Sequence, residues 1–448
     1  MRGPRPAASS SHRAGGRGRL AAELLIYNLV LLALSPVLAA WLLWRMSVRR
    51  KSLGSLRHRI GLIPRAPKSG WPRLWLHAVS AGEMAALRPV LEALRGIFPQ
   101  AYILVSTVTP AGMTVARRSC TAADDICYLP FDGPGCMGRA MWRQRPALVV
   151  VAEKELWPNL LGLARLCGAR VLTINGRVSD RVMRRAHWAG GFVRWLYRLP
   201  DVLCVQSEQD SRRLQELGVP ARRIALAGNT KADNMAARDP RTEERLADDI
   251  GAREGEVWLV AGSTHQGEEE LVAEAFRLVT ERLPTARLLL APRHLERVLS
   301  VSAMLAERGM SVVRRTERKP APPGGVVLLD TMGELQSAYA LGAAGFVGGT
   351  LVPVGGHNLL EPLASGRAVI FGPHTANCAD VADLVREAGV GFQVSGAAEL
   401  AERFLAIAAD AELRAALARA SGALIESQRG ASARCAAAAR DLLGEVGN

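Results

Sequence analysis

The chain has 448 residues, a net charge of +15 and 49% hydrophobic residues. This length suits two domains of roughly 150–200 residues each, and the hydrophobic content supplies a core for both, which excludes a disordered protein. The positive charge predicts an anionic partner. No basic stretch is interleaved with aromatic residues and no nucleic-acid-binding module is present, so a membrane surface and anionic substrates are favoured over nucleic acid.

The seven cysteines are odd in number, scattered, and form no C-x-x-C pair. This pattern argues against a disulfide framework and a zinc site, and is typical of a reducing compartment. The chain also contains no Asp-x-Asp, HExxH or G-x-S-x-G sequence. Nothing in the sequence therefore calls for a metal or another cofactor.

The first feature along the chain is a basic stretch followed by an apolar run. Residues 1–21 are rich in Arg, Gly, Ser and Pro, and we expect them to be disordered. From Leu24 to Trp44 no side chain is charged, and a helix of that length reaches about 31 Å, close to the hydrocarbon thickness of a bilayer. We predict a transmembrane anchor over residues 22–46. A cleaved signal peptide is the alternative, but the apolar run continues past the small-residue site at 37–39.

Basic residues flank both ends of this run, so charge alone does not orient the predicted anchor. The free cysteines favour a cytoplasmic location for the globular part.

From Arg73 onward, short apolar runs alternate with amphipathic stretches, the βαβ rhythm of a parallel sheet covered on both faces. The strands predicted before a polar segment at 234–255 are 74–80, 102–108, 147–153, 170–176 and 202–208. Those predicted after it are 257–263, 286–292, 311–315, 326–330, 345–349 and 368–372. We predict two Rossmann-like α/β domains facing a cleft, over residues 47–235 and 236–448.

Three segments of the first half bring charged side chains to strand ends or to the domain break, where ligands of parallel sheets bind. After strand 74–80, the sequence Ser-Ala-Gly-Glu places Glu83 at a helix amino terminus, where the dipole favours an ionised carboxylate. Strand 147–153 carries Glu153 to the same edge, and Lys231 lies just before the domain break and can point into the cleft. The alternatives are capping carboxylates for the glutamates and a solvated surface lysine.

A glycine-rich segment of the second half, residues 330–374, has the pattern of a nucleotide site. Two glycine pairs, 348–349 and 355–356, bracket a loop, and the sequence from His357 to Pro362 then opens a helix. Glycines let the backbone approach a phosphate, and a helix amino terminus supplies N–H donors. Glu361 can accept hydrogen bonds from both ribose hydroxyls. No P-loop sequence is present, so we predict a nucleotide site of the glycosyltransferase kind. A glycine-rich turn without function is the alternative.

Seven strings stand in the order found in one enzyme family: SAGE (80–83), ELWPNL (155–160), INGRVSDR (174–181), GNTKAD (228–233), APRH (291–294), TMGEL (331–335) and GGTLVPVGGHNLLEP (348–362). Over roughly residues 24–430 the chain resembles the Kdo transferases, which transfer 3-deoxy-manno-octulosonate (Kdo) from CMP-Kdo to a lipid A precursor. The resemblance implies a GT-B fold of two Rossmann-like domains behind an amino-terminal membrane helix. The first domain would bind the acceptor and the second CMP-Kdo.

The resemblance also implies roles for single residues. The catalytic base falls on Glu83, and residues that stabilise the transition state fall on Glu153 and Lys231. The implied CMP-binding residues are Pro292, Arg293, Met332, Gly333, Glu334, Asn358, Leu359, Leu360 and Glu361.

The chain departs from the usual family pattern at three positions. It has Lys154 where the family usually has Thr, Leu359 where Pro is frequent, and Val182 where Ser is frequent. Lys154 lies between two carboxylates and is expected to alter acceptor contacts. Contacts made by the backbone should survive Leu359.

The implied reaction is an inverting displacement, in which Glu83 takes a proton from the acceptor hydroxyl and this oxygen attacks the anomeric carbon opposite CMP. The implied partners are CMP-Kdo, a phosphorylated lipid A precursor (lipid IVA) and the cell inner membrane, with the catalytic domains in the cytoplasm. The basic residues of 45–66 would hold the acceptor near the bilayer. Alternatives are another GT-B glycosyltransferase, a sugar-nucleotide epimerase of the same fold, and a non-catalytic, membrane-tethered nucleotide-binding protein. The SAGE and ELWPNL strings favour Kdo transfer.

Overall fold

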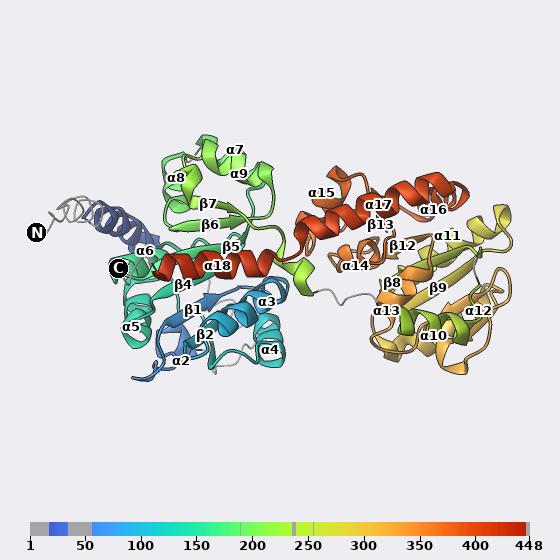
Figure 1. The fold of residues 1–448 in the computed structure, drawn as a ribbon, viewed down its shortest axis with the longest axis horizontal. Coiled ribbons are helices and arrows are strands. Elements are labelled where there is room, and N and C mark those ends of the chain that lie inside the picture. Colours follow the sequence, from blue (N-terminus) through green and yellow to red (C-terminus); the bar gives the residue numbers. More distant parts are fainter. Residues whose placement is uncertain (1–17, 35–55, 189, 235–238, 254, 445–448) are drawn as a thin grey trace, which may run out of the picture. The chain divides into compact units, whose positions relative to one another are not determined.

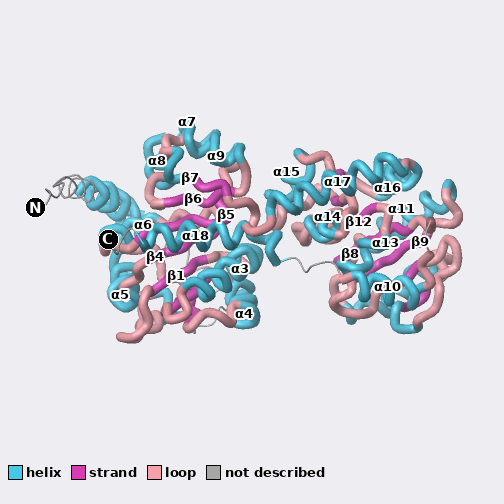
Figure 2. The backbone as a smooth tube through the Cα atoms, viewed as in Figure 1, coloured by secondary structure: helices cyan, strands magenta, loops and turns pink. Residues whose placement is uncertain are grey.

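The computed structural model describes residues 18–34, 56–188, 190–234, 239–253 and 255–444. These residues form two compact units (Figure 1). The first contains the described residues up to Asn234 and those from Gln428 onward, and the second contains those between them. Each unit holds one seven-stranded sheet in which every pairing is parallel, with helices packed against it (Figure 2). The prediction of two parallel α/β domains is confirmed.

The sheet of the first unit has the order β3-β2-β1-β4-β5-β6-β7. Its strands are β1 (Arg73–His77), β2 (Tyr102–Thr107), β3 (Asp125–Tyr128), β4 (Leu148–Ala152), β5 (Arg170–Gly176), β6 (Val202–Val205) and β7 (Ile224–Leu226). Its helices are α2 (Leu56–Arg59), α3 (Ala81–Ile97), α4 (Pro110–Ser119), α5 (Pro134–Gln144), α6 (Pro158–Leu166), α7 (Asp180–Trp188), α8 (Gly190–Tyr197), α9 (Glu208–Glu216) and α18 (Ala431–Gly444), with 3₁₀ turns η2 (Ala221–Arg223) and η3 (Thr230–Asn234). The order reverses between β1 and β4, so a ligand site is expected beyond the carboxyl ends of these two strands.

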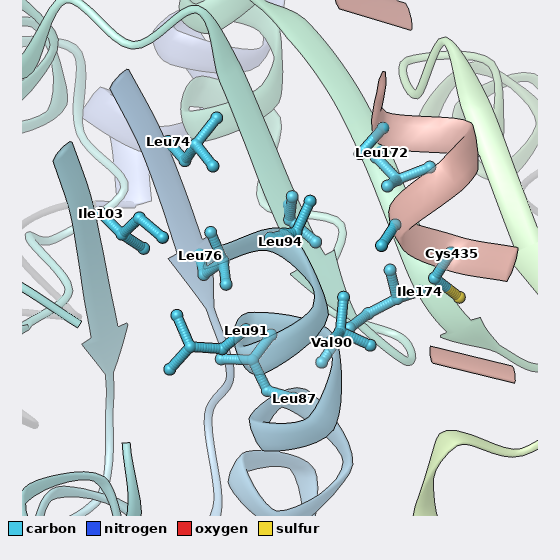
Figure 3. Close-up of a cluster of buried hydrophobic side chains, with 14 of the residues drawn as sticks. Leu74, Leu76, Leu87, Val90, Leu91, Leu94, Ile103, Leu172, Ile174 and Cys435 are labelled. Carbon is cyan, nitrogen blue, oxygen red and sulfur yellow. The ribbon is translucent and has the colours of Figure 1, made fainter. Parts of the chain in front are cut away.

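The two faces of this sheet carry separate apolar clusters because successive side chains of a strand point to opposite faces. On one face the sheet packs against α3 and α18, and Figure 3 shows strand residues Leu76 and Ile174 directed toward Val90 of α3 and Cys435 of α18. On the other face, Trp75 of β1 packs with buried residues of α5 and α6. Burial on both faces explains why the central strands are continuous apolar runs.

The sheet of the second unit has the order β10-β11-β9-β8-β12-β13-β14, with its own reversal between β8 and β12. Its strands are β8 (Trp258–Thr264), β9 (Arg287–Pro292), β10 (Val312–Arg314), β11 (Val326–Leu328), β12 (Ala344–Val347), β13 (Val369–Phe371) and β14 (Gly391–Gln393). Its helices are α10 (Pro240–Ile250), α11 (Glu269–Arg282), α12 (Val298–Glu307), α13 (Leu335–Leu341), α14 (Leu360–Ala364), α15 (Ala379–Glu387), α16 (Ala397–Ala409) and α17 (Ala411–Gln428), with 3₁₀ turns η4 (Leu295–Arg297) and η5 (Arg315–Glu317).

The carboxyl-terminal helix α18 corrects the predicted domain boundaries. We assigned all of residues 236–448 to the second domain, but α18 packs on the sheet of the first unit. The Asp233 carboxylate accepts hydrogen bonds from the N–H groups of Gly430 (2.8 Å) and Ser432 (2.7 Å), which fixes the start of the helix. Arg434 donates to the Ala227 carbonyl at 2.8 Å. The sequence pattern of an alanine-rich helix is compatible with packing on either sheet. The contacts of Asp233 and Arg434 fix α18 on the sheet of the first unit.

The amino-terminal prediction is partly corrected and partly outside the described residues. Residues 18–34 are helical, so residues 18–21, assigned to a disordered tail, belong to a helix, while residues 1–17 are not described. No helix within the described ranges has both the length and the apolar character needed to cross a membrane. The second half of the predicted anchor, residues 35–46, lies outside the described residues.

The three strands that the sequence did not predict are β3, β7 and β14, and all three lie at sheet edges. Their sequences, DICY, IAL and GFQ, are short, and the first and last include a charged or polar residue. An edge strand is less enclosed than a central one and does not need a long apolar run. In the polar segment expected to separate the domains, α10 buries Leu246 and Ile250, so that segment is partly helical.

Candidate active site and donor site

Glu83 lies at the amino terminus of α3, directly beyond β1, and its carboxylate is fixed by a capping box. Ser80 is the N-cap and accepts from the Glu83 N–H at 3.3 Å, while Glu83 accepts from the Val79 N–H at 2.8 Å and from the Ser80 hydroxyl at 3.0 Å. Burial, opposed by the Val79 hydrogen bond, raises the pKa of Glu83 above its usual value. A carboxylate held in one position with a raised pKa suits a general base, although the same contacts also satisfy the capping role.

Glu153 and Lys231 form an ion pair beside this carboxylate. The Lys231 Nζ lies 2.9 Å from the Glu153 Oε1, and each side chain is about one-fifth exposed. The two charges also act on Glu83, with Glu153 raising and Lys231 lowering the pKa of that carboxyl. Glu153 directly follows β4 and has a φ of 55°, a left-handed conformation that is uncommon for a residue with a side chain. Such backbone strain is concentrated at functional sites.

A buried amide network, which the sequence did not predict, holds this ion pair. Asn175, at the end of β5 and fully buried, donates from Nδ2 to the Glu153 Oε1 at 3.3 Å and accepts at Oδ1 from the Thr230 N–H at 3.1 Å. Asn229 accepts from the Lys231 N–H at 3.0 Å and donates to Gln206 at 3.3 Å. Asn175 therefore links the strand end that carries Glu153 to the turn that carries Lys231.

Glu155 is a third carboxylate of this cluster, and we did not assign it a role from the sequence. Burial, then the charges of Glu83 and Glu153, raise the pKa of Glu155 to about 7. The E-x-E spacing at 153–155 was the signal that could have identified it. Lys154, between the two glutamates, is exposed.

In the second unit, backbone N–H groups of the glycine-rich loop are bound within the protein. The backbone N–H groups of Gly349, Thr350 and Leu351 donate to the buried carboxylate of Glu268 at 2.6, 3.0 and 2.8 Å. Gly355 and Gly356 donate to the Gly349 carbonyl at 3.0 and 2.7 Å. The N–H groups of Gly349, Gly355 and Gly356 are therefore already bound by Glu268 and by the loop itself.

The remaining part of that loop leaves donors available. The N–H groups of His357, Asn358 and Leu359 have no protein partner among the residues described. Leu359 and Leu360 are fully buried, so only their backbone can face a ligand. Asn358 Nδ2 lies 3.5 Å from the Glu361 Oε1, and burial raises the pKa of Glu361, which the Asn358 amide and Arg293 oppose.

The remaining residues implied in CMP binding lie at the end of β9 and between β11 and α13. Pro292 ends β9 and is buried, whereas Arg293 is exposed and acts electrostatically on Glu361. Met332 is 71% exposed, and Gly333 has a φ of +88°. These two residues precede α13.

Glu334 is committed to a structural contact. Arg315 binds its carboxylate through Nε and Nη2, both at 2.9 Å, and the Thr331 hydroxyl also donates to it. Arg245 lies 3.6 Å away. A role for segment 332–334 in binding a base or ribose therefore falls to its backbone and to Met332. Nowhere in the described part of the chain are three or more His, Cys, Asp or Glu side chains arranged to hold a metal ion.

Comparison with solved structures shows the fold. The calicheamicin glycosyltransferase CalG4 superposes with a TM-score of 0.54 at 15% identity, over 84% of this chain and 99% of that one. The UDP-GlcNAc 2-epimerase of Neisseria meningitidis superposes with a TM-score of 0.52 at 13% identity, over 79% of this chain and 99% of that one. The chain is therefore similar in fold to GT-B glycosyltransferases, and the fold alone does not separate a transferase from an epimerase.

Sequence comparison distinguishes the transferase from the epimerase. The family described as "3-Deoxy-D-manno-octulosonic-acid transferase (kdotransferase)" matches residues 54–234, the part that carries Glu83, Glu153 and Lys231. The 3-deoxy-D-manno-octulosonic acid transferase of Bordetella pertussis is 32% identical over 94% of this chain and 99% of its own length. That of Haemophilus influenzae is 32% identical over 81% of this chain and 85% of its own length. The chain belongs to the Kdo transferase family of glycosyltransferases.

Proposed function

We propose that this protein transfers Kdo from CMP-Kdo to a hydroxyl of a phosphorylated lipid A precursor in lipopolysaccharide biosynthesis, with inversion at the anomeric carbon. The observation that carries the proposal is the fixed Glu83 carboxylate beside the Glu153–Lys231 ion pair, at the carboxyl ends of β1 and β4. The relatives described above supply the substrate class.

Glu83 is the general base of the proposed reaction. The capping box points one oxygen at the Val79 N–H and the other at the Ser80 hydroxyl. Each carboxylate oxygen has a second lone pair, so Glu83 retains acceptor capacity for the proton of an acceptor hydroxyl. The raised pKa of Glu83 makes it a stronger base than a solvated carboxylate, which lowers the cost of removing that proton.

Lys231 offsets negative charge as the transition state forms. The acceptor oxygen loses its proton while the phosphate of the donor begins to leave, so negative charge develops on both. Glu153 and Asn175 hold Lys231 in place, which avoids reorganising that cation during the reaction. CMP is a good leaving group, so the proposed reaction needs no second carboxylate as general acid.

The donor site of the proposal lies in the second unit. The N–H groups of His357 and Asn358 would receive the phosphate, and Glu361, oriented by Asn358, would accept hydrogen bonds from the ribose hydroxyls. Arg293 adds positive charge beside this segment.

We propose that the amino-terminal segment, including residues 22–46, keeps the protein at the cytoplasmic face of the inner membrane. Two observations support this role, one on how the helix is attached to the first unit and one on the apolar side that it exposes. Leu24 is buried against Gly162 of α6, and Asn28 exchanges hydrogen bonds with Asn159 at 2.9 Å, so this helix is tied to the first unit. Its other side exposes Leu25, Ile26, Leu29 and Leu32 by 57–69%. An apolar surface of this kind is typical of a membrane-facing helix.

The test is a reaction of purified protein with CMP-Kdo and the tetra-acylated precursor lipid IVA, read by mass spectrometry. We expect a product heavier than the acceptor by one or more Kdo residues, together with free CMP. Release of CMP with no glycosylated lipid, or no reaction with any lipid A precursor, would contradict the proposal. Retention of the full-length protein in carbonate-washed membranes tests the membrane part separately.

A further inference from the structure

Three histidines gather at the carboxyl ends of three adjacent strands of the second unit, and the reaction proposed above gives none of their rings a role. His265 directly follows β8, His294 follows β9, and His357 lies in the loop after β12. Their strands are neighbours in the order β9-β8-β12, across the point where the strand order reverses. In parallel sheets this is where ligands bind.

The rings are in direct contact. The Nε2 atoms of His265 and His357 are 2.8 Å apart, and these two rings are stacked at 5.1 Å between centroids with an interplanar angle of 3°. His294 meets the His265 ring edge-on at 5.5 Å. At 2.8 Å, one imidazole must donate and the other accept, so a single proton occupies the contact between the two Nε2 atoms.

The surrounding backbone is shaped to hold this pair. Gly349 has a φ of +69°, and a Cβ at that position would lie 3.2 Å from the Cδ2 and 3.4 Å from the Nε2 of His357. Glu268 accepts from the N–H of His265 at 3.2 Å and also binds the N–H groups that follow β12. One buried carboxylate thus fixes both segments that carry the stacked rings.

The charges around the rings are mainly positive. Burial, then the neighbouring His265 and Arg293, lower the pKa of His357 to about 4, and burial with His294, Arg293 and Arg297 lowers the pKa of His265. The acidic side chains near the rings either already bind other groups of the protein or lie at the exposed edge of the cluster. Glu269 pairs with Arg297 at 2.6 Å, Glu268 is held by backbone N–H groups, Glu361 contacts Asn358, and the exposed Glu296 lies 3.8 Å from His294.

We propose that His265, His294 and His357, with Arg293, form an oxyanion subsite that takes up a proton when an acidic group of the donor binds. An anion beside the stacked pair would stabilise an additional proton, taken from solvent, on the ring that otherwise accepts, since each ring could then donate a hydrogen bond to the anion. The inference rests on the donor proposed above, which carries two groups of this chemistry, the nucleotide phosphate and the carboxylate of the octulosonic acid.

The experiment is calorimetric titration of the full-length protein with CMP and, separately, with CMP-Kdo, in buffers of different ionisation enthalpy at one neutral pH. For the wild type we expect both ligands to bind and net proton uptake with CMP-Kdo. His265→Gln and His357→Gln should each weaken CMP-Kdo binding by about 10- to 100-fold and reduce the proton uptake. His294→Gln, at a half-exposed position that tolerates substitution, should show a smaller loss of about 3- to 10-fold.

The matched control is His58→Gln in the first unit, where the imidazole accepts from the Tyr128 N–H at 3.2 Å and a glutamine oxygen can replace it. This variant should bind both ligands, with proton uptake, as the wild type does. Equal loss for CMP and CMP-Kdo in the site variants would assign the subsite to the phosphate, and loss confined to CMP-Kdo would assign it to the carboxylate.

Two further outcomes would overturn the inference, and they are distinguishable. Unchanged affinities and unchanged proton uptake in all three site variants would refute the subsite while leaving the donor assignment intact. A wild-type protein that binds neither ligand would refute both.

Discussion

The strand order of both sheets reverses at one point, yet the loops there carry different groups, mainly carboxylates in the first unit and imidazoles with an arginine in the second. In the first unit, the ends of β1 and β4 hold three carboxylates, Glu83, Glu153 and Glu155, of which one is paired with Lys231. In the second, the ends of β8 and β12 hold stacked imidazoles near Arg293, and the Glu268 carboxylate is satisfied by backbone N–H groups. The shared topology sets where a ligand binds, and the loops set which chemistry is available there.

This difference fits the proposed roles of the two units, proton removal in the first and donor binding in the second. A cluster of buried carboxylates raises proton affinity, which favours removing a proton from a hydroxyl. A cluster of neutral imidazoles and arginines favours an anion, since it gains stabilisation from negative charge. Changes at each site should therefore affect different measurements.

The largest expected effect is that of Glu83→Gln on transfer. Glutamine preserves the capping box, because it can still accept from the Val79 N–H, but it cannot accept a proton. We expect transfer to fall by at least about 10²-fold, with CMP affinity and melting temperature close to those of the wild type. Near-normal transfer would instead identify Glu83 as a capping residue alone and make Glu153 the next candidate for the base.

The next effect is that of Glu361→Ala on CMP binding. Loss of the ribose hydrogen bonds should cost about 1–3 kcal/mol of binding free energy, measured by titration calorimetry, and should leave the first unit unaffected. Glu334→Gln is the matched comparison, since Arg315 holds that carboxylate. Its substitution should lower the melting temperature without changing CMP affinity. Unchanged CMP affinity in Glu361→Ala would remove Glu361 from the donor site.

The charge difference also predicts opposite pH dependence of the two units. The pKa of Glu155 is raised to about 7, so the stability that its neutral form provides is lost as pH rises through that value. The pKa of His357 is lowered to about 4, so the stability that its neutral form provides is lost as pH falls below its ordinary value toward 4. Each pKa shift should change the free energy of unfolding of its unit by about 1–3 kcal/mol across its pH range.

Hydrogen exchange of backbone amides, corrected for intrinsic rates, measures both effects in one protein. Protection should fall in the first unit as pH rises from about 5 to about 8, and in the second as pH falls from about 7 to about 4. Glu155→Gln should remove the first dependence and His357→Gln the second. Parallel pH profiles in the two units would show that the contrast in charge has no energetic consequence.

The smallest expected effect concerns the helix that returns to the first unit. Asp233→Ala removes the acceptor for the N–H groups at the start of α18 and should cost about 1 kcal/mol of unfolding free energy. Asp383→Ala is a suitable comparison, since the Asp383 carboxylate pairs with Arg386 of the same helix, α15. Equal losses would indicate that the cap on α18 contributes nothing specific.

The sequence by itself determined the elements that local pattern controls. Central strands need continuous apolar runs, so β1, β4 and β8 were identified, whereas β3, β7 and β14 at the edges do not and were missed. Glu83 was predicted to begin a helix after a turn at Ala81-Gly82, and it lies in the first turn of α3, which starts at Ala81 because Ser80 caps it. The ordered motifs identified the family, and with it the candidate roles of Glu83, Glu153 and Lys231.

Only the tertiary structure decided which groups distant in the chain meet. Asn175 reaches Glu153 and Thr230, Glu268 takes up the N–H groups of the glycine-rich loop, and Arg315 occupies Glu334. The sequence likewise did not indicate that α18 packs on the sheet of the first unit. A buried polar group must find a partner, but its residue type does not specify which of many possible partners the fold brings within hydrogen-bond distance. For that reason the residue types of the site were predictable, and its network of contacts was not.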